Sequence, residues 1–420
     1  MADITPYTIA VPDAAIEDLK VRLALTKFPN ELDQAGWDLG SPLGDVKRLV
    51  VYWREKYDWR KAEAELNRYP QYTTSIHVDG FDPLNVHFVY KKSPIENAIP
   101  LLFVHGWPGT YHEGLKMFDK LTEGDGVKEP AFDVVLISLP NYSWSDGVKA
   151  RGFAIEQYAE CCNKLMLKLG YNCYSTQGGD WGFYITRAMS LMYPQHVKAT
   201  HLNFDFGTAP TWSQYPLLSL QHALTPYSAR EKKGLERSKW FLEEGSGYRT
   251  EQGTKPQTLG YALADSPVAL LGWIYEKLHD WTDDYPFTDD EVCTWISLYW
   301  FSKAGPAANV RIYYEATHIW NQSDPTFLKE KITRERVGEW IPHVKIGYSH
   351  QPAELRPVPK TWVKKLGNVV FDRDSDSGGH FFAFEKPEQL VRDLRDMFRR
   401  GGGAYGTVTG RNGYFERPKL

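Results

Sequence analysis

The chain has 420 residues, of which 42% are hydrophobic and 24% are charged, as in a soluble globular protein rather than a disordered or fibrous one. A formal net charge of −4, with no long runs of Lys or Arg, argues against a nucleic-acid or anionic-membrane surface. The longest apolar stretches, such as residues 98–104, are too short to span a bilayer. The four cysteines fit neither a disulfide framework nor a zinc site.

Residues 1–90 are predicted to form a helical arm followed by a pair of strands. Ser41-Pro42 is a helix-start signal, and apolar residues follow it at helical spacing over 43–57. Alternating residues on either side of an Asp-Gly turn within 74–90 predict two paired strands. The apolar face of the arm predicts that it packs on a larger body.

From residue 98 onwards, short apolar runs alternate with longer helical stretches. This is the pattern of a mostly parallel sheet covered by helices on both faces. The predicted strands are 99–104, 132–139, 171–177, 198–202, 344–348 and 368–371. The predicted helices are 155–169, 228–244, 267–281 and 387–399.

The alternation is interrupted over residues 205–310, where Trp, Tyr, Leu and Ser are frequent. The simplest architecture is an α/β core in two parts, 91–204 and 311–400, separated by a helical lid. Residues 401–420 are rich in glycine with scattered charges. We therefore expect a C-terminal tail that docks weakly or not at all.

Asp180 lies in a glycine-rich segment, residues 177–182 (Gln-Gly-Gly-Asp-Trp-Gly), where a predicted strand ends and a helix begins. Glycines on both sides of one reactive residue are typical of a nucleophile elbow, in which close helix–strand approach leaves no room for Cβ atoms. An aspartate here can also be a helix N-cap, but the flanking glycines favour the nucleophile. A carboxylate nucleophile displaces at an sp³ carbon and forms an alkyl ester, whereas a serine would form acyl esters.

A second glycine-rich segment follows the first strand of the predicted core. Residues 105–109 read His-Gly-Trp-Pro-Gly, a bend that can aim a backbone N–H at a reacting carbonyl oxygen. An ordinary tight turn is the simpler interpretation of this segment alone. Its position one strand–helix unit before Asp180 favours an oxyanion hole made by the backbone N–H groups of Trp107 and Trp181.

His380 lies on a Gly-Gly loop between the last predicted strand and the last helix, where it can act as a base. The acid that orients it is expected on the loop after the preceding strand, where Glu354 lies. Three rivals lie on the loop that leads into the histidine itself: Asp372, Asp374 and Asp376. We interpret those three as a solvated acidic turn and prefer Glu354.

Together these motifs resemble epoxide hydrolases of the microsomal type, members of the α/β-hydrolase superfamily, from about residue 5 to 400. The matching segments are 40–43, 52–53, 57–60, 66–67 and 87–89 in the arm, with 105–109, 178–182 and 378–381 in the core. The resemblance implies an α/β-hydrolase core with a helical lid and an N-terminal arm. It also implies a small apolar epoxide as substrate, with no cofactor and no metal.

The family also uses two tyrosines to hold the epoxide oxygen. Residues 245–248 (Gly-Ser-Gly-Tyr) resemble the first position, which assigns Tyr248. Residues 311–315 (Arg-Ile-Tyr-Tyr-Glu) resemble the second, where the Tyr-x-Glu spacing selects Tyr313 over its neighbour. Without the resemblance, either tyrosine would be interpreted as packing.

The resemblance implies a two-step reaction that yields a vicinal diol. Asp180 attacks an epoxide carbon while Tyr248 and Tyr313 donate hydrogen bonds to the ring oxygen. Water activated by His380, which Glu354 orients, then hydrolyses the ester.

Two other functions remain open. A haloalkane dehalogenase would use the same three catalytic side chains, with the indole N–H of Trp181 holding the halide. A non-catalytic protein could keep the same pocket for a lipophilic ligand. Detoxification and biosynthesis are both compatible with an epoxide hydrolase.

The N-terminus lacks the basic and apolar regions of a signal peptide. The mammalian and insect members of the microsomal type carry a membrane anchor before the arm, whereas this sequence begins at the arm. We therefore expect a soluble, cytoplasmic protein of the kind seen in fungi, with no nucleic-acid partner. The family alone suggests a homodimer.

Overall fold

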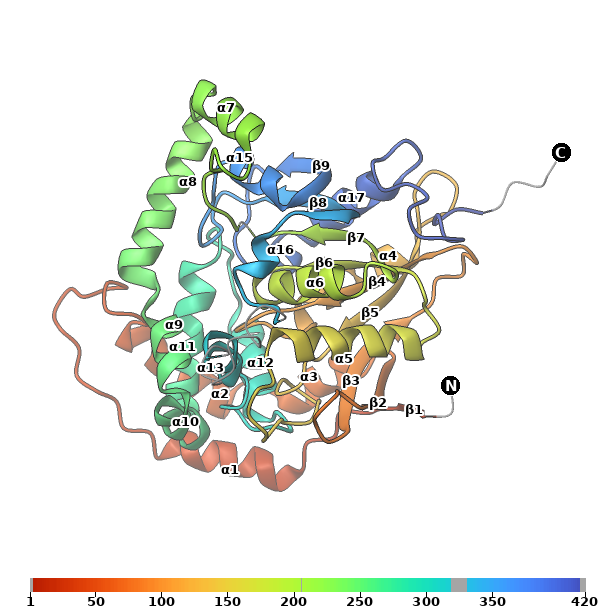
Figure 1. Ribbon diagram of the computed structural model, residues 1–420. Helices are drawn as coiled ribbons and strands as arrows, with labels where there is room; N and C mark the ends of the chain where they lie inside the picture. The colour runs from red at the N-terminus through yellow and green to blue at the C-terminus, as the bar shows by residue number, and fades with distance from the viewer. Residues whose placement is uncertain (1–2, 205, 319–330, 416–420) are drawn as a thin grey trace.

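The computed structural model describes residues 3–204, 206–318 and 331–415 (Figure 1). Over these residues the central sheet has nine strands in the order β1-β2-β3-β5-β4-β6-β7-β8-β9. The strands are β1 (Ile4–Pro6), β2 (Gln71–Ile76), β3 (Leu84–Lys91), β4 (Ile99–Val104), β5 (Phe132–Ile137), β6 (Tyr174–Gly178), β7 (Val197–Leu202), β8 (Ile341–His350) and β9 (Gly367–Asp374). All pairings from β5 to β9 are parallel, whereas β1, β2 and β3 extend the β5 edge in antiparallel pairing.

Helices cover both faces of this sheet, which confirms the predicted α/β core. On one face α5 (Ile155–Lys168) packs against α6 (Asp180–Met192), and on the other α4 (Leu115–Thr122) packs against α17 (Pro387–Phe398). Strands β4 and β5 are buried at every residue, as continuous apolar strands between two helical layers must be. Two short helices complete the core, α15 (Lys360–Val363) and α16 (Phe382–Glu385).

The chain between β7 and β8 forms a helical lid to one side of the sheet (Figure 1). Its helices are α7 (Pro216–Leu224), α8 (Ala229–Trp240), α9 (Gly247–Thr254), α10 (Pro256–Asp265), α11 (Pro267–Asp280), α12 (Asp289–Trp300) and α13 (Arg311–Thr317). A Ser or Thr side chain caps the start of α8, α11 and α12, which fixes where these helices begin. No helix of the described ranges combines the length and apolarity that crossing a membrane requires.

The N-terminal arm connects the lid to the core. Its helices are α1 (Asp13–Ala24), α2 (Leu43–Glu55) and α3 (Trp59–Leu66). Helix α2 packs on α11 and α12 of the lid, where the indole N–H of Trp53 donates to Ser297 Oγ at 3.2 Å. Because β1 and β2 of the same segment join the sheet, the arm contacts both the core and the lid.

The described part of the C-terminal tail, residues 401–415, packs on the core. Ala404, Val408 and Tyr414 are buried. The backbone of Gly413 accepts a hydrogen bond from Ala131 N (2.9 Å) and donates one to the carbonyl of Asn97 (2.7 Å). The prediction of a weakly docked tail is therefore wrong, because its glycines serve left-handed turns, as at Gly413, rather than a loose chain.

Candidate active site

Asp180 is the first residue of α6 and directly follows the turn at the end of β6. Its φ of 48° is a left-handed conformation that only a constrained turn imposes on a residue with a side chain. A Cβ atom on Gly178 would lie 2.5 Å from the carbonyl oxygen of Gly182, and one on Gly182 would overlap the carbonyl oxygen of Val104. The glycines are thus required by close contact of strand and helix, as a nucleophile elbow demands.

The loop after β4 brings a backbone donor to this carboxylate. The N–H of Trp107 donates to Asp180 Oδ1 at 2.8 Å. A Cβ atom on Gly106 would overlap the Asp180 side chain, so glycine is needed for this approach. Trp181 lies in the first turn of α6, where backbone N–H groups have no acceptor within the helix.

His380 lies between two carboxylates. Its Nδ1 is 2.6 Å from Glu354 Oε1, and its Nε2 is 3.6 Å from Asp180 Oδ2. Burial lowers the pKa of His380, but the Glu354 and Asp180 carboxylates outweigh burial and raise it to about 10. The imidazole is therefore protonated at neutral pH.

Glu354 is fully buried on the loop after β8, and the lid holds that loop. The guanidinium of Arg237, on α8, donates to the backbone carbonyls of Glu354 (2.6 Å) and Ala353 (2.8 Å). The same group also donates to the carbonyl of Asp280 at the end of α11 (2.9 Å). One lid side chain thus fixes the acid-bearing loop of the core.

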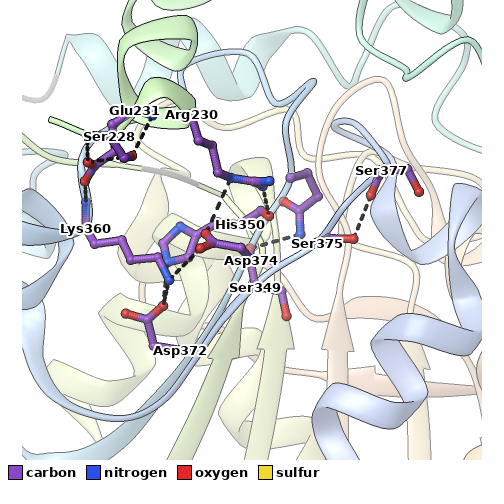
Figure 2. Close-up of polar contacts among 11 residues, drawn as sticks. Ser228, Arg230, Glu231, Ser349, His350, Lys360, Asp372, Asp374, Ser375 and Ser377 are labelled. Atoms are coloured by element: carbon purple, nitrogen blue, oxygen red, sulfur yellow. Dashed lines mark hydrogen bonds and ion pairs between the residues drawn. The ribbon is translucent and has the colours of Figure 1, made fainter.

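The three rival aspartates do not contact His380. Figure 2 shows that Asp372 and Asp374 belong to another polar cluster, where Lys360 Nζ lies 2.6 Å and 3.0 Å from their carboxylates. Arg230 lies 3.5 Å from Asp374, and Asp376 is exposed. Among the residues that the structure describes, only Glu354 and Asp180 place a carboxylate within 4 Å of the imidazole.

The lid brings both predicted tyrosines close to Asp180. The ring of Tyr248, on α9, stacks on Trp107 at 5.3 Å, and Tyr313, on α13, meets the ring of Trp181 edge-on at 4.9 Å. The two phenol rings are 5.8 Å apart and both are buried. Burial, followed by the neighbouring phenol or the Asp180 carboxylate, raises both pKa values well above the usual range, so both tyrosines are protonated donors. The Tyr313 hydroxyl has no hydrogen-bond partner within the described ranges.

Glu385 is a part of the site that the sequence does not reveal. Its carboxylate accepts hydrogen bonds from the backbone N–H groups of Gly379 and Phe381, both at 3.1 Å, on either side of His380. It also accepts one from Asp283 N of the lid at 3.0 Å. Burial raises its pKa to about 7 despite these hydrogen bonds. A single glutamate after the histidine motif gives no pattern from which this clamp could be predicted.

Glu113 is a second buried carboxyl group that sequence analysis overlooks. It borders a cavity of about 10 Å³, the room that one water molecule needs, whose lining includes Asp180 and His380. Burial raises the pKa of Glu113 to about 8. A Cβ atom on Gly109 would overlap the Glu113 carboxylate, so that glycine makes room for it. In the described ranges no three His, Cys, Asp or Glu side chains are arranged to hold a metal ion.

Comparisons with known proteins agree with this fold. Residues 4–114 match the family model of the epoxide hydrolase N terminus, and residues 99–235 match that of the alpha/beta hydrolase fold. A relative from Stigmatella aurantiaca, provisionally named an epoxide hydrolase, is 38% identical over 94% of this chain and 85% of its own. Epoxide hydrolase 1 of Sus scrofa is 32% identical over 93% of this chain and 88% of its own. The solved structure of Aspergillus niger epoxide hydrolase matches with a TM-score of 0.77 at 32% identity, covering 93% of this chain and 94% of the other. The chain therefore belongs to the epoxide hydrolase family of the α/β-hydrolase fold.

Proposed function

We propose that this enzyme converts an apolar epoxide to a vicinal diol through a covalent ester on Asp180. One juxtaposition carries the proposal: a carboxylate on a strained elbow faces two buried, protonated phenols. A carboxylate attacks sp³ carbon, and phenol donors suit an alkoxide that is otherwise a poor leaving group. Neither feature is needed for acyl transfer.

In the first step an Asp180 oxygen attacks an epoxide carbon, and the ring C–O bond breaks. The alkoxide oxygen is held by the hydroxyls of Tyr248 and Tyr313 and takes a proton from one of them. The His380 imidazolium then gives its proton to the phenolate left behind, which restores the tyrosine and leaves His380 neutral. This release is favoured because the ester removes the Asp180 charge, one of the two charges that raise the pKa of the imidazole.

In the second step neutral His380 takes a proton from water, whose oxygen attacks the ester carbonyl on Asp180. The backbone N–H groups of Trp107 and Trp181 stabilise the oxyanion, each contributing about 3–4 kcal/mol. Collapse releases the diol and returns Asp180 as a carboxylate and His380 as an imidazolium, so protons balance over the cycle. Glu354, bonded to Nδ1, keeps Nε2 directed at the nucleophile.

The proposal is tested by mass spectrometry on the variant His380→Gln, incubated with a panel of epoxides and haloalkanes. Without its base the enzyme should accumulate an adduct with the mass of the whole epoxide on the peptide that contains Asp180. His77→Gln, at a histidine with a 63% exposed side chain, is the matched control and should accumulate none.

Each of the other outcomes contradicts the proposal in a different way. An alkyl adduct formed with loss of halide, and none from epoxides, would indicate a haloalkane dehalogenase. A folded variant that forms no adduct with any compound would indicate a pocket that only binds lipophilic ligands.

A further inference from the structure

Arg334 contacts Tyr184, which lies one helical turn after Asp180 on α6, and two further arginines interact electrostatically nearby. The guanidinium of Arg334 lies over the rings of Tyr184 (4.9 Å) and Trp181 (5.6 Å) and donates to the Tyr184 hydroxyl at 2.9 Å. Arg356 is the second arginine, and its electrostatic neighbours are Tyr184, Arg334 and the third arginine, Arg249. The three come from distant segments of the chain: α9, the segment before β8 and the loop after β8.

Each arginine is held close to a residue of the site. Arg249 directly follows Tyr248 on α9, and Arg356 lies two residues after Glu354. Arg334 extends over Trp181, the neighbour of Asp180. The positive cluster is thus fixed by the same elements that carry the catalytic groups.

No acidic side chain balances this cluster over the ranges that the structure describes. No Asp or Glu oxygen there lies within 4 Å of the guanidinium groups of Arg249, Arg334 or Arg356, and of these three groups only that of Arg334 makes a hydrogen bond. The Nε of Arg356 is buried without a partner. Burial, together with the two neighbouring arginines, lowers the pKa of Arg356. A buried donor left unpaired beside like charges, as at Arg356 Nε, is unfavourable unless an anion joins them.

The charged cluster of Figure 2 shows what compensation looks like in this protein. There Lys360 and Arg230 meet Asp372 and Asp374, so positive and negative side chains alternate. The three arginines near Tyr184 are also partly buried, but in the described ranges no acidic side chain pairs with them. This unbalanced cluster lies near Asp180.

An aromatic wall connects the general base to the cluster. The ring of Phe204 lies 5.9 Å from His380 and 6.1 Å from Tyr184. Phe183 and Phe206 pack against the same rings. A ligand with its reacting carbon at Asp180 and an apolar body along Phe204 would extend toward the arginines.

From this arrangement we infer that Arg249, Arg334 and Arg356 form an anion-binding subsite, and that the preferred substrate is an apolar epoxide bearing a carboxylate. A carboxylate fits because the planar guanidinium fork matches it in a bidentate manner. The inference rests on the proposed function, since it places the epoxide at Asp180.

A different role for the same charges predicts different behaviour. The fields of Arg249 and Arg334 lower the pKa of Tyr248, against the larger effect of burial. If that field were their whole purpose, every epoxide would depend on the arginines to the same extent, whether charged or neutral.

The experiment compares matched acids and amides on the full-length enzyme. Binding is measured by calorimetry with 4-vinylbenzoate and 4-vinylbenzamide, which carry an unreactive alkene where the substrate has its epoxide. The longer pair undec-10-enoate and its amide covers a wider spacing. The values of kcat/KM are then measured for the four corresponding epoxides.

We expect at least one acid to bind about tenfold more tightly than its amide at low salt. Arg334→Gln and Arg356→Gln should each lower binding and kcat/KM for that acid about tenfold more than for the amide. The preference should shrink as ionic strength rises. Arg68→Gln, at an exposed arginine of the arm paired with Glu65, is the control and should leave the preference unchanged.

Equal binding of acid and amide in both pairs would overturn the inference, as would arginine variants that weaken both members equally. If Arg334→Gln or Arg356→Gln fails to fold, Arg249→Gln, at a partly exposed position on the lid, decides in the same assay. Preferred acid binding without hydrolysis of any epoxide would keep the subsite and contradict the proposed function. Hydrolysis of the epoxides without preference for the acid would support the proposed function and overturn the subsite.

Discussion

The core half of the site (Asp180, His380 and Glu354) and its lid half (Tyr248 and Tyr313) differ in the charge of their polar groups. In the core half the charged groups pair with one another and with the backbone, as at His380 Nδ1 and Glu354 Oε1, 2.6 Å apart, although the second Glu354 oxygen is buried without a partner in the described ranges. In the lid half two neutral phenols face the nucleophile, and the Tyr313 hydroxyl is buried without a partner in the described ranges.

The core half is therefore organised before a ligand binds, whereas the lid half can recognise the ligand. The charges of the core half are compensated before a ligand arrives, so the general base and its acid need no rearrangement to act. A buried hydroxyl without a partner is unfavourable by roughly 1–3 kcal/mol, and a ligand oxygen that accepts from it recovers that free energy. Under the proposed mechanism, the lid half is therefore the part that selects for an oxygen at the reacting centre.

The largest expected effect comes from the lid half. Tyr248→Phe and Tyr313→Phe should each slow ester formation about 10²-fold, and the double variant about 10⁴-fold, because each hydroxyl stabilises the alkoxide. Rapid-quench mass spectrometry in the His380→Gln background measures this step. Tyr314→Phe, whose hydroxyl faces Arg151 instead, is the matched control. A near-normal rate in the double variant would show that the two hydroxyls do not stabilise the alkoxide, which contradicts the role proposed for the lid half.

Glu385→Gln should affect the core half alone. An amide would replace one carboxylate oxygen with a donor facing the N–H groups of Gly379 or Phe381, which loosens the His380 loop. We expect ester hydrolysis to slow about tenfold with ester formation unchanged, as single-turnover kinetics would report. Glu388→Gln, three residues further and paired with Lys120 at the surface, should change neither step. Equal slowing of both steps would indicate general destabilisation.

The pKa of His380 reports on the charges of the core half. Asp180→Asn removes one of the two carboxylates that raise the pKa of the imidazole, so that pKa should fall below about 10 and stay above its usual value because Glu354 remains. Titration by ¹⁵N NMR, with the His380 signal assigned from His380→Gln, measures the change. An unchanged pKa would mean that the two groups are not coupled.

Glu113→Gln should have the smallest effect, on stability rather than on rate. With a folded-state pKa of about 8, Glu113 keeps its proton on folding, whereas the unfolded chain releases it above about pH 4.5. Folding stability from this group therefore falls as pH rises between these values, by up to about 1.4 kcal/mol per pH unit. The glutamine variant should lose that part of the slope in urea titrations from pH 5 to 8. Identical slopes would show that the carboxyl group is ionised in the folded enzyme.

The fold was largely predictable where burial is two-sided. Strands β4 and β5 read as continuous apolar runs because helices cover both of their faces. Helix α12 was not predicted, since its buried side chains face the arm, the core and the lid and leave no single stripe. The tail was misread because glycine is common both in loose segments and in tight turns.

The residues of the candidate site also differ in how directly the sequence predicts them. Glycines around Asp180 and His380 report backbone constraints that act within a few residues, so the sequence indicates these two directly. Tyr248 and Tyr313 are two of 25 tyrosines, and only the family resemblance selected them. Glu385 and the arginines around Tyr184 act through contacts between distant segments, which no local pattern encodes. The catalytic roles of all these side chains stay predictions until the experiments above are made.

Arg237 links substrate exchange to the integrity of the catalytic apparatus. One guanidinium bonds the carbonyls of Ala353 and Glu354 in the core and that of Asp280 in the lid. Any outward swing of α8 must break these bonds and release the loop that carries the acid. Under the proposed mechanism, such an opening would leave an ester on Asp180 unhydrolysed until the lid returned, so that lid opening and turnover would be coupled.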